Sequence, residues 1–161
     1  MTIAASQREC YRAAGLPEDF VQDNHSRSRK GVLRGLHFQM RRSQGKLVTV
    51  IHGRILDVAV DVRSGSPTFG RRAGAELSDA GPRQIYVPPG FAHGFCVLSD
   101  FADIYYKVTD FYDPADAAGI VWNDPEIGID WPVGDPLTSA RDAAYPKLRD
   151  LPSHRLPMFP R

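Results

Sequence analysis

The feature that most constrains the fold is a series of short apolar segments between residues 32 and 102, separated by turn-forming residues. The segments are VLRGLHF, KLVTVIHG, RILDVAVDVR, RRAGAEL, QIYVPPG and AHGFCVL, and Gly, Pro, Asp and Ser separate them. They have the length of strands, they are rich in β-branched residues, and turn residues recur about every 8–12 positions. This pattern predicts an all-β sandwich or barrel.

Alternation of apolar and polar residues is clearest in residues 54–63. A strand with this pattern buries one face and exposes the other. The apolar set is Ile55, Val58, Val60 and Val62, and the polar set is Arg54, Asp57, Asp61 and Arg63. The aromatic segment DIYYKVT, residues 103–109, predicts a further strand.

The segment before these strands predicts less regular structure. Ser6 can cap a short helix that runs to about Gly15, and Pro17 ends it. Residues 22–31, QDNHSRSRKG, are polar and basic, which predicts a loop.

The segment after the strands is rich in turn residues. Residues 110–136 hold several Pro and Asp residues around the two tryptophans, which predicts a packed, loop-rich segment rather than a linker. Residues 137–145 predict one or two helical turns capped by Thr138 or Ser139. The Pro-rich residues 146–161 predict a loosely attached tail. The whole pattern predicts a compact β-barrel or jelly roll with short terminal helices.

Length and composition bound the class of protein. A chain of 161 residues fits one domain, 1–161, and a hydrophobic content of 42% excludes wholesale disorder. Because 20 basic and 19 acidic residues leave a net charge of +1, no overall charge attracts nucleic acid or an anionic membrane. No apolar run approaches the ~20 residues of a membrane helix.

The cysteines and the first residues bear on location. Cys10 and Cys96 form no CxxC pair, so they give neither a disulfide framework nor a zinc signature. The start, MTIAASQREC, lacks the long apolar segment of a signal peptide. We therefore expect a soluble, cytoplasmic protein.

Three types of side chain on the predicted strands could move protons or stabilise charge. His37, in RGLHFQ, is either a core histidine or a site residue that transfers protons. Lys46 is a solvated charge at a strand start, unless it points into the barrel toward a developing oxyanion. Tyr105 and Tyr106 face opposite sides of their strand, so one of them points inward, as packing or as a general acid.

Asp142 and His93 complete the set of candidate residues. Asp142 either lies in the first turn of a helix, where the dipole favours it, or orients an imidazole. His93 follows a Pro-Pro-Gly turn, and the glycines around it suit a ligand wall as well as a tight turn. Because the sequence has no H-x-H pair and no glutamate at ligand spacing, we expect no metal site.

Several segments, in this order, resemble one known family. They are VQDNHSRSRKGVLRGLHFQ, QGKLV, ILDVAVDVRSGSPTFG, YVPPGFAHGF, YYKVTDFYDP, GIVWNDPEIGIDWP and SARDA. Their order and spacing, from about Phe20 to Leu148, are similar to those of the dTDP-4-dehydrorhamnose 3,5-epimerases. The resemblance implies a cupin-type jelly-roll β-barrel with short flanking helices, a homodimer, and chemistry that needs no metal or cofactor.

The resemblance also implies roles for the candidate residues. His37 stands at the position of the catalytic base, and Asp142 at that of its partner in a His–Asp dyad. Tyr106 matches the acid on the opposite face, and Lys46 matches the lysine that faces the keto oxygen. The residues at substrate-binding positions are Gln22, Asn24, Arg34, His93, Tyr112 and Arg141.

The implied reaction is epimerisation at C3 and C5 of dTDP-4-dehydro-6-deoxy-D-glucose to dTDP-4-dehydro-L-rhamnose, in dTDP-L-rhamnose biosynthesis. The first alternative is an epimerase that acts at C3 or C5 alone. The others are a sugar-nucleotide-binding protein without turnover and a metal-dependent cupin oxygenase, which the missing ligand set disfavours.

Two positions depart from the family pattern. Family members carry an N-terminal strand with a D-E-R-G-type motif, which residues 1–15 lack, so we expect weaker substrate binding and dimerisation. The family often has a glutamate at the position of Ala117, and whether the adjacent Asp116 replaces it stays open.

Overall fold

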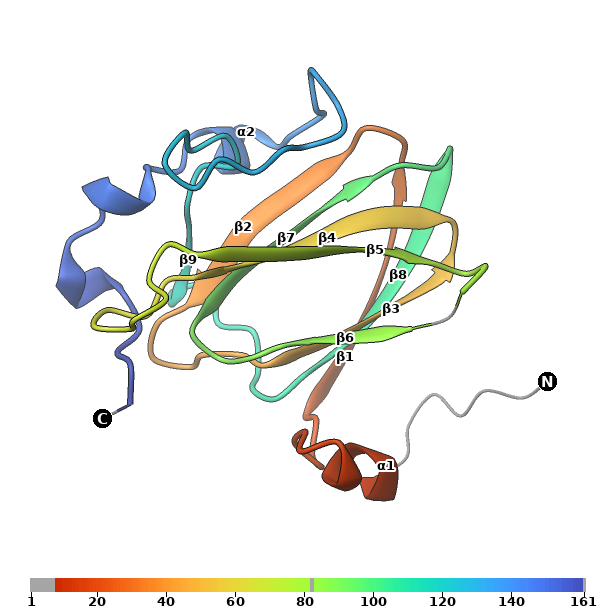
Figure 1. The fold of residues 1–161 in the computed structure, drawn as a ribbon, viewed down its shortest axis with the longest axis horizontal. Coiled ribbons are helices and arrows are strands. Elements are labelled where there is room, and N and C mark those ends of the chain that lie inside the picture. Colours follow the sequence, from red (N-terminus) through yellow and green to blue (C-terminus); the bar gives the residue numbers. More distant parts are fainter. Residues whose placement is uncertain (1–7, 82, 161) are drawn as a thin grey trace.

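The computed structural model describes residues 8–81 and 83–160, and its strands form two antiparallel sheets (Figure 1). In the first sheet the order is β1 (Gln22–Arg29), β8 (Phe101–Val108), β3 (Lys46–His52) and β6 (Gln84–Val87). In the second it is β5 (Arg72–Ser78), β4 (Arg54–Asp61), β7 (Phe91–Val97), β2 (Leu33–Gln39) and β9 (Ala117–Gly119). The two sheets make a jelly-roll sandwich, which confirms the predicted all-β class.

The space between the two sheets holds an apolar core. Strands of both sheets contribute buried side chains to it, so its burial holds the sheets together. These residues are Val48, Val50, Ile55, Leu77, Phe95, Val97, Ala102 and Ile104.

A second core lies on the other side of the five-stranded sheet. Side chains of β2, β4 and β7 pack there against residues 118–156 of the C-terminal segment, including Ile120, Trp131, Leu148 and Leu156. The prediction of a loosely attached tail is therefore wrong, because both leucines are buried and Ser64 pairs with Met158.

Burial on both faces also corrects the expected pattern of β4. Ile55 belongs to the core between the sheets, whereas Val58, Val60 and Val62 belong to the second core. Asp57 and Asp61 are buried rather than solvated. The two-faced burial explains this, since a sheet covered on both sides needs no polar outer face.

Strand β1 corrects the prediction of a loop at residues 22–31. The strand pairs with β8 from Gln22 opposite Val108 to Arg29 opposite Phe101. Backbone hydrogen bonds to a neighbouring strand stabilise it although its side chains are polar. Strand β9 was also missed, because three residues in a loop-rich segment give no periodic signal.

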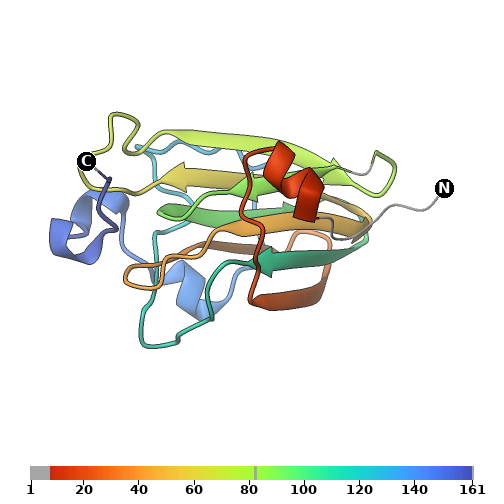
Figure 2. The same ribbon diagram turned by 90° about the horizontal axis from the view of Figure 1, so that it is seen from below.

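The helices are short and lie at the ends of the chain. Helix α1 (Arg8–Ala13) confirms the N-terminal helix, and Ser6 lies outside the described residues. It lies apart from the strands, below them in Figure 1 and in front of them in Figure 2. Helix α2 (Ala140–Ala143) begins after Ser139, whose hydroxyl accepts a hydrogen bond from the Asp142 amide. This confirms the predicted cap.

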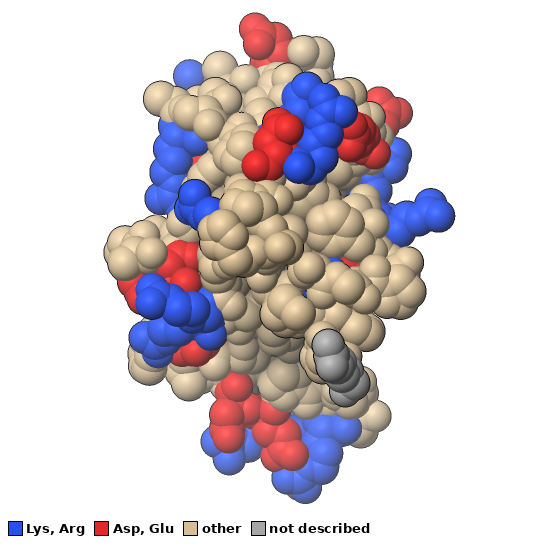
Figure 3. Space-filling model, turned by 90° about the vertical axis from the view of Figure 1, so that its left-hand side faces the viewer, with Lys and Arg blue, Asp and Glu red and all other residues tan. Residues whose placement is uncertain are grey.

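Two single 3₁₀ turns, Leu148–Asp150 and Ser153–Arg155, follow in the C-terminal segment. Figure 3 shows the face that carries this segment, where clusters of basic and acidic side chains alternate around an uncharged centre. No helix in the described part of the chain is long and apolar enough to cross a membrane.

Candidate active site

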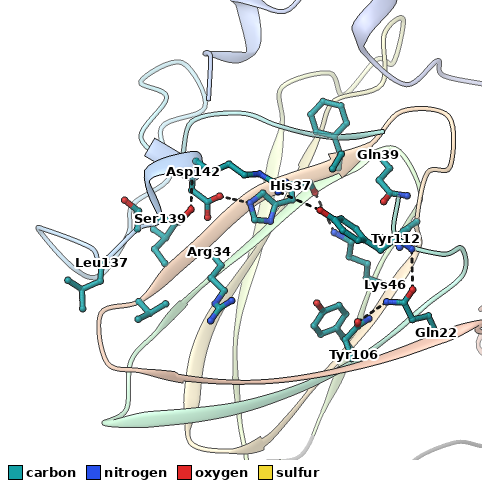
Figure 4. Close-up of a pocket in the computed structure, with 18 residues that line it drawn as sticks. Gln22, Arg34, His37, Gln39, Lys46, Tyr106, Tyr112, Leu137, Ser139 and Asp142 are labelled. Atoms are coloured by element: carbon teal, nitrogen blue, oxygen red, sulfur yellow. Dashed lines mark hydrogen bonds and ion pairs between the residues drawn. The ribbon is translucent and has the colours of Figure 1, made fainter. Parts of the chain in front are cut away.

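A cavity of about 690 Å³ opens between β2 of one sheet and β1, β3 and β8 of the other (Figure 4). Its size suits a ligand larger than a simple sugar. Its polar or ionisable lining residues are Gln22, Asn24, Arg34, His37, Gln39, Gln44, Lys46, Tyr106, Tyr112, Thr138, Ser139, Arg141 and Asp142. Nine of the ten residues expected at the site therefore line one cavity, and His93 is the exception.

Strand β2 presents both Arg34 and His37 to the cavity because its pairing with β7 shifts register between them. In a regular strand, residues three apart face opposite sides, and a bulge puts them on one side. Gly35 permits the close approach of the two strands, since a Cβ there would lie 2.6 Å from Gly94 Cα. Its φ of +126° also excludes most other residues.

His37 and Asp142 form a dyad at the cavity wall. The His37 Nε2 atom lies 2.8 Å from Asp142 Oδ1, and the Gly35 amide donates to Asp142 Oδ2 at 3.2 Å. Burial opposes ionisation of Asp142, but the hydrogen bonds from His37 and Gly35 outweigh it and hold its pKa below the usual range. An ionised carboxylate only accepts hydrogen bonds, so Nε2 carries the proton and Nδ1 keeps its lone pair.

Lys46 points into the molecule rather than into solvent. It is 9% exposed, and its ammonium donates a long hydrogen bond of 3.4 Å to the His37 carbonyl. Burial lowers the pKa of Lys46 to about 8, with the negative charge of Asp57 opposing this shift. The structure thus places a cation beside the dyad, as an oxyanion would require.

Tyr106 lies across the cavity from His37 (Figure 4). Burial raises the pKa of its phenol, although the positive charge of Arg34 opposes that shift. The phenol is therefore protonated at neutral pH and can donate a proton. Tyr105 takes the other side of β8, where its hydroxyl donates to Asp23.

The remaining expected residues surround one end of the cavity. Gln22 donates to the Asn24 side chain and accepts from the Tyr112 amide, which fixes the loop that carries Tyr112. Arg141 donates to the Tyr145 hydroxyl at 2.7 Å and approaches the Tyr112 hydroxyl at 3.5 Å. Arg34 forms no ion pair with any described residue, so its guanidinium is open to a ligand.

His93 and Asp116 lie behind the cavity wall. His93 is buried on β7 and its Nε2 lies 2.8 Å from Asp57 Oδ2. Asp116 accepts hydrogen bonds from the Arg41 and Arg42 amides, whereas Ala117 lines the cavity. The Asp116 carboxylate is thus committed to the backbone rather than presented where the family often has a glutamate.

Four polar lining residues were not expected from the sequence as site residues: Gln39, Gln44, Thr138 and Ser139. The strand period could have found Gln39, which shares a face with His37 two residues earlier. Within residues 8–81 and 83–160 no group of three or more His, Cys, Asp or Glu side chains could hold a metal ion.

Fold and site together define a jelly-roll protein with a cavity suited to proton transfer. A histidine paired with a carboxylate, a protonated phenol and a buried ammonium face this one cavity. A sequence profile described as dTDP-4-dehydrorhamnose 3,5-epimerase matches residues 2–150. The chain belongs to this family, whose members are isomerases.

Individual relatives agree with the family assignment. The Pseudomonas aeruginosa dTDP-4-dehydrorhamnose 3,5-epimerase is 57% identical over 138 residues, which are 85% of this chain and 76% of the relative. A crystal structure of the Legionella pneumophila 3,5-epimerase, in complex with dTDP-4-keto-L-rhamnose, superposes with a TM-score of 0.94 and 48% identity. That match covers 98% of this chain and 85% of the other.

A relative of narrower activity is also similar. The Streptomyces niveus dTDP-4-dehydrorhamnose 3-epimerase is 46% identical over 131 residues, which are 81% of this chain and 63% of the relative. Single-site and double-site epimerases therefore share this fold.

Proposed function

We propose that this chain converts dTDP-4-dehydro-6-deoxy-D-glucose to dTDP-4-dehydro-L-rhamnose by inverting C3 and C5, as a 3,5-epimerase of dTDP-L-rhamnose biosynthesis. The observation that carries the proposal is the placement of His37 and Tyr106 on opposite sides of one cavity (Figure 4). Inversion requires a proton to leave from one face of the sugar and return to the other.

His37 is the base of the proposed mechanism. The C3 and C5 protons both lie next to the C4 carbonyl, so their removal gives an enolate. Nδ1 of His37 holds the free lone pair, and Asp142 stabilises the imidazolium that forms when Nδ1 takes the proton.

Lys46 stabilises the enolate in this proposal. The negative charge of the enolate collects on O4, and a fixed ammonium lowers the energy of that charge without reorganisation. A buried lysine does so more strongly than a solvated one, because water screens less of the interaction.

Tyr106 then delivers a proton to the opposite face of the carbon, which completes the inversion. Before the second carbon reacts, the phenolate takes up a proton from solvent and the His37 imidazolium releases one to solvent, which resets both groups. Burial raises the free energy of the transient phenolate, and the nearby positive charge of Arg34 offsets part of that cost.

The other end of the cavity suits the nucleotide. The open guanidinium of Arg34 can hold a diphosphate, which arginine binds with a geometry that matches phosphate oxygens. Tyr112 offers an aromatic wall for the thymine, with Arg141 beside it. Gln22 and Asn24 supply amide groups, whereas His93 lies behind the cavity wall, where it contacts Asp57 instead of the ligand space. We also propose a cytoplasmic homodimer.

The first experiment is proton NMR of dTDP-4-keto-6-deoxyglucose with the purified protein in deuterated water. Loss of both the C3 and C5 proton signals, with formation of the L-rhamno product, supports the proposal. Loss of only one signal identifies a single-site epimerase, which the Streptomyces niveus relative makes a concrete alternative. No loss from the folded protein contradicts proton abstraction from this substrate and favours a binding protein.

A further inference from the structure

A second buried His–Asp pair lies behind the cavity, and the mechanism above does not use it. His93 on β7 and Asp57 on β4 meet at 2.8 Å, and both side chains are buried. Their strands are neighbours in the five-stranded sheet, with His93 opposite Ala59. Asp57 turns only Oδ2 toward His93.

The other carboxylate oxygen of Asp57 makes no hydrogen bond that would stabilise the fold. Asp57 Oδ1 is fully buried and has no hydrogen-bond partner among the described residues. An uncompensated carboxylate oxygen is costly in a protein interior. Such an oxygen is expected to act on a charge nearby.

Lys46 is the charge that the geometry brings near, because its ammonium lies 3.4 Å from the His37 carbonyl and His37 is directly opposite His93 in the pairing of β2 with β7. Burial opposes its protonation, Asp57 favours it, and no carboxylate of the described chain lies within ion-pair distance of its ammonium. Asp142, the other buried carboxylate near the site, is committed to His37 and Gly35. The Asp57 interaction therefore acts through space, across a buried region that screens charges less than water does.

The remaining groups around Lys46 include one carboxylate, Asp142, which is already paired with His37. They come from β2, β7, β8, the 110–116 loop and α2. The titratable or charged ones are Arg34, His37, His93, Tyr106, Tyr112, Arg141 and Asp142, of which only Asp142 is an anion.

We propose that Asp57, held in place by His93, is the counterion that keeps the catalytic ammonium of Lys46 protonated. Asp57 is a positioning residue, since it acts on the substrate only through Lys46. The consequence for catalysis rests on the proposed function, but the charge coupling itself exists without substrate. His93 orients Asp57 from behind the cavity wall.

The test is an NMR titration of the lysine side chains in the free protein. The chain has only four lysines, Lys30, Lys46, Lys107 and Lys147, so ¹³Cε signals are easily assigned. In the Asp57→Asn variant we expect the titration midpoint of Lys46 to fall by about one pH unit or more. The three other midpoints stay unchanged. A Lys46 midpoint that does not move overturns the proposal.

Asp61→Asn is the matched control. Asp61 is another buried carboxylate of β4, but Arg63 pairs with it at 2.7 Å. This variant removes the same charge from the same strand and is expected to leave the Lys46 midpoint in place. An equal fall in both variants would mean that general loosening of β4 causes the shift, and it would refute a specific counterion.

A measurement on the unaltered protein covers the case in which Asp57→Asn does not fold. The ¹³Cγ signal of Asp57 is expected to show a step at the Lys46 midpoint, because the two charges act on each other reciprocally. Absence of this step refutes the proposal. Neither measurement uses substrate. A failed epimerase assay would therefore contradict only the proposed function, and an absent charge coupling would contradict only the role of Asp57.

Discussion

At the scale of single residues, the proposed chemistry depends on the direction of one hydrogen bond. His37 and Asp142 are 105 positions apart in sequence and meet at 2.8 Å. Because the pKa of Asp142 is held low, the carboxylate fixes the proton on Nε2 and leaves Nδ1 to act as the base. The base is thus prepared before substrate arrives.

Replacement of the base is expected to stop proton abstraction. His37→Ala should lower the rates of deuterium exchange at C3 and C5 by about 100-fold or more while the fold stays intact. His52→Ala, at an exposed histidine that pairs with Asp79, is the matched control and should exchange normally. Near-normal exchange in His37→Ala would remove His37 from the role of base.

Replacement of the acid is expected to separate the two proton transfers. Tyr106→Phe keeps the ring but loses the hydroxyl, so net epimerisation should fall more than deuterium exchange from the original face. Tyr105→Phe, on the other side of the same strand, should leave both rates unchanged. Parallel loss of exchange and product in Tyr106→Phe would speak against an acid on the opposite face.

Lys46 is expected to set the alkaline limit of activity. The mechanism needs its charged form, which is present below its pKa of about 8 and lost above it, so kcat/KM should fall as the pH rises through that value. The Lys46→Arg variant keeps its positive charge throughout this pH range. It should therefore react more slowly, but its kcat/KM should not fall as the pH rises. The profiles are measured from pH 6 to 10, and an unchanged decline in Lys46→Arg would assign it to another group.

At the scale of elements, strand ends and loops bring the site together. The loop after β8 carries Tyr112 and is held on both sides by buried polar side chains. Gln39 donates to the Phe111 carbonyl and accepts from the Asp113 amide, while Asp116 binds the Arg41 and Arg42 amides. These bonds fix the loop after β8 against the turn after β2.

The hydrogen bonds from the Arg41 and Arg42 amides to Asp116 can be tested by substitution. Asp116→Ala leaves two backbone donors without their acceptor, so the free energy of unfolding should fall by about 1–3 kcal/mol. KM should rise because Tyr112 is less well placed. Asp113→Ala is the comparison, because this half-buried carboxylate of the same loop accepts from a single backbone amide, that of Ala115, and its loss should cost less than that of Asp116. Urea unfolding and steady-state kinetics measure the two effects. An unchanged free energy of unfolding in Asp116→Ala would show that Asp116 does not hold the loop in place.

At the scale of the whole molecule, the five-stranded sheet is a layer between two cores. One core lies between the sheets, and the C-terminal segment covers the other face. Both faces of β4 are therefore buried, which lets its inner face carry Asp57 toward Lys46 without exposing the strand to water.

The covering role of the C-terminal segment can be tested at its end. Leu156 is 7% exposed, and Leu156→Ala should lower the free energy of unfolding by about 2–5 kcal/mol. Met158, two residues on, is 72% exposed, so Met158→Ala should change it by less than about 0.5 kcal/mol. Equal effects in denaturant unfolding would show that the tail does not cover this core.

The sequence by itself determined which segments become strands and which residues are candidates for the chemistry. Strand length, β-branching and turn residues are local properties, and they located the strands from β2 to β8. The spacing of motifs identified the family and nine of the residues that line the cavity. The predicted helix cap at Ser139 likewise depended only on residues that are neighbours in sequence.

Only the tertiary structure decided what lies on the two faces of those strands. Strand β1 is polar, so nothing local distinguishes it from a loop, and its pairing with β8 supplies the hydrogen bonds that make it a strand. The burial of Asp57 and the tail follow from contacts between segments far apart in sequence. The bulge in β2 and the low dielectric around Lys46 arise in the same way, because both exist only after the two sheets have packed.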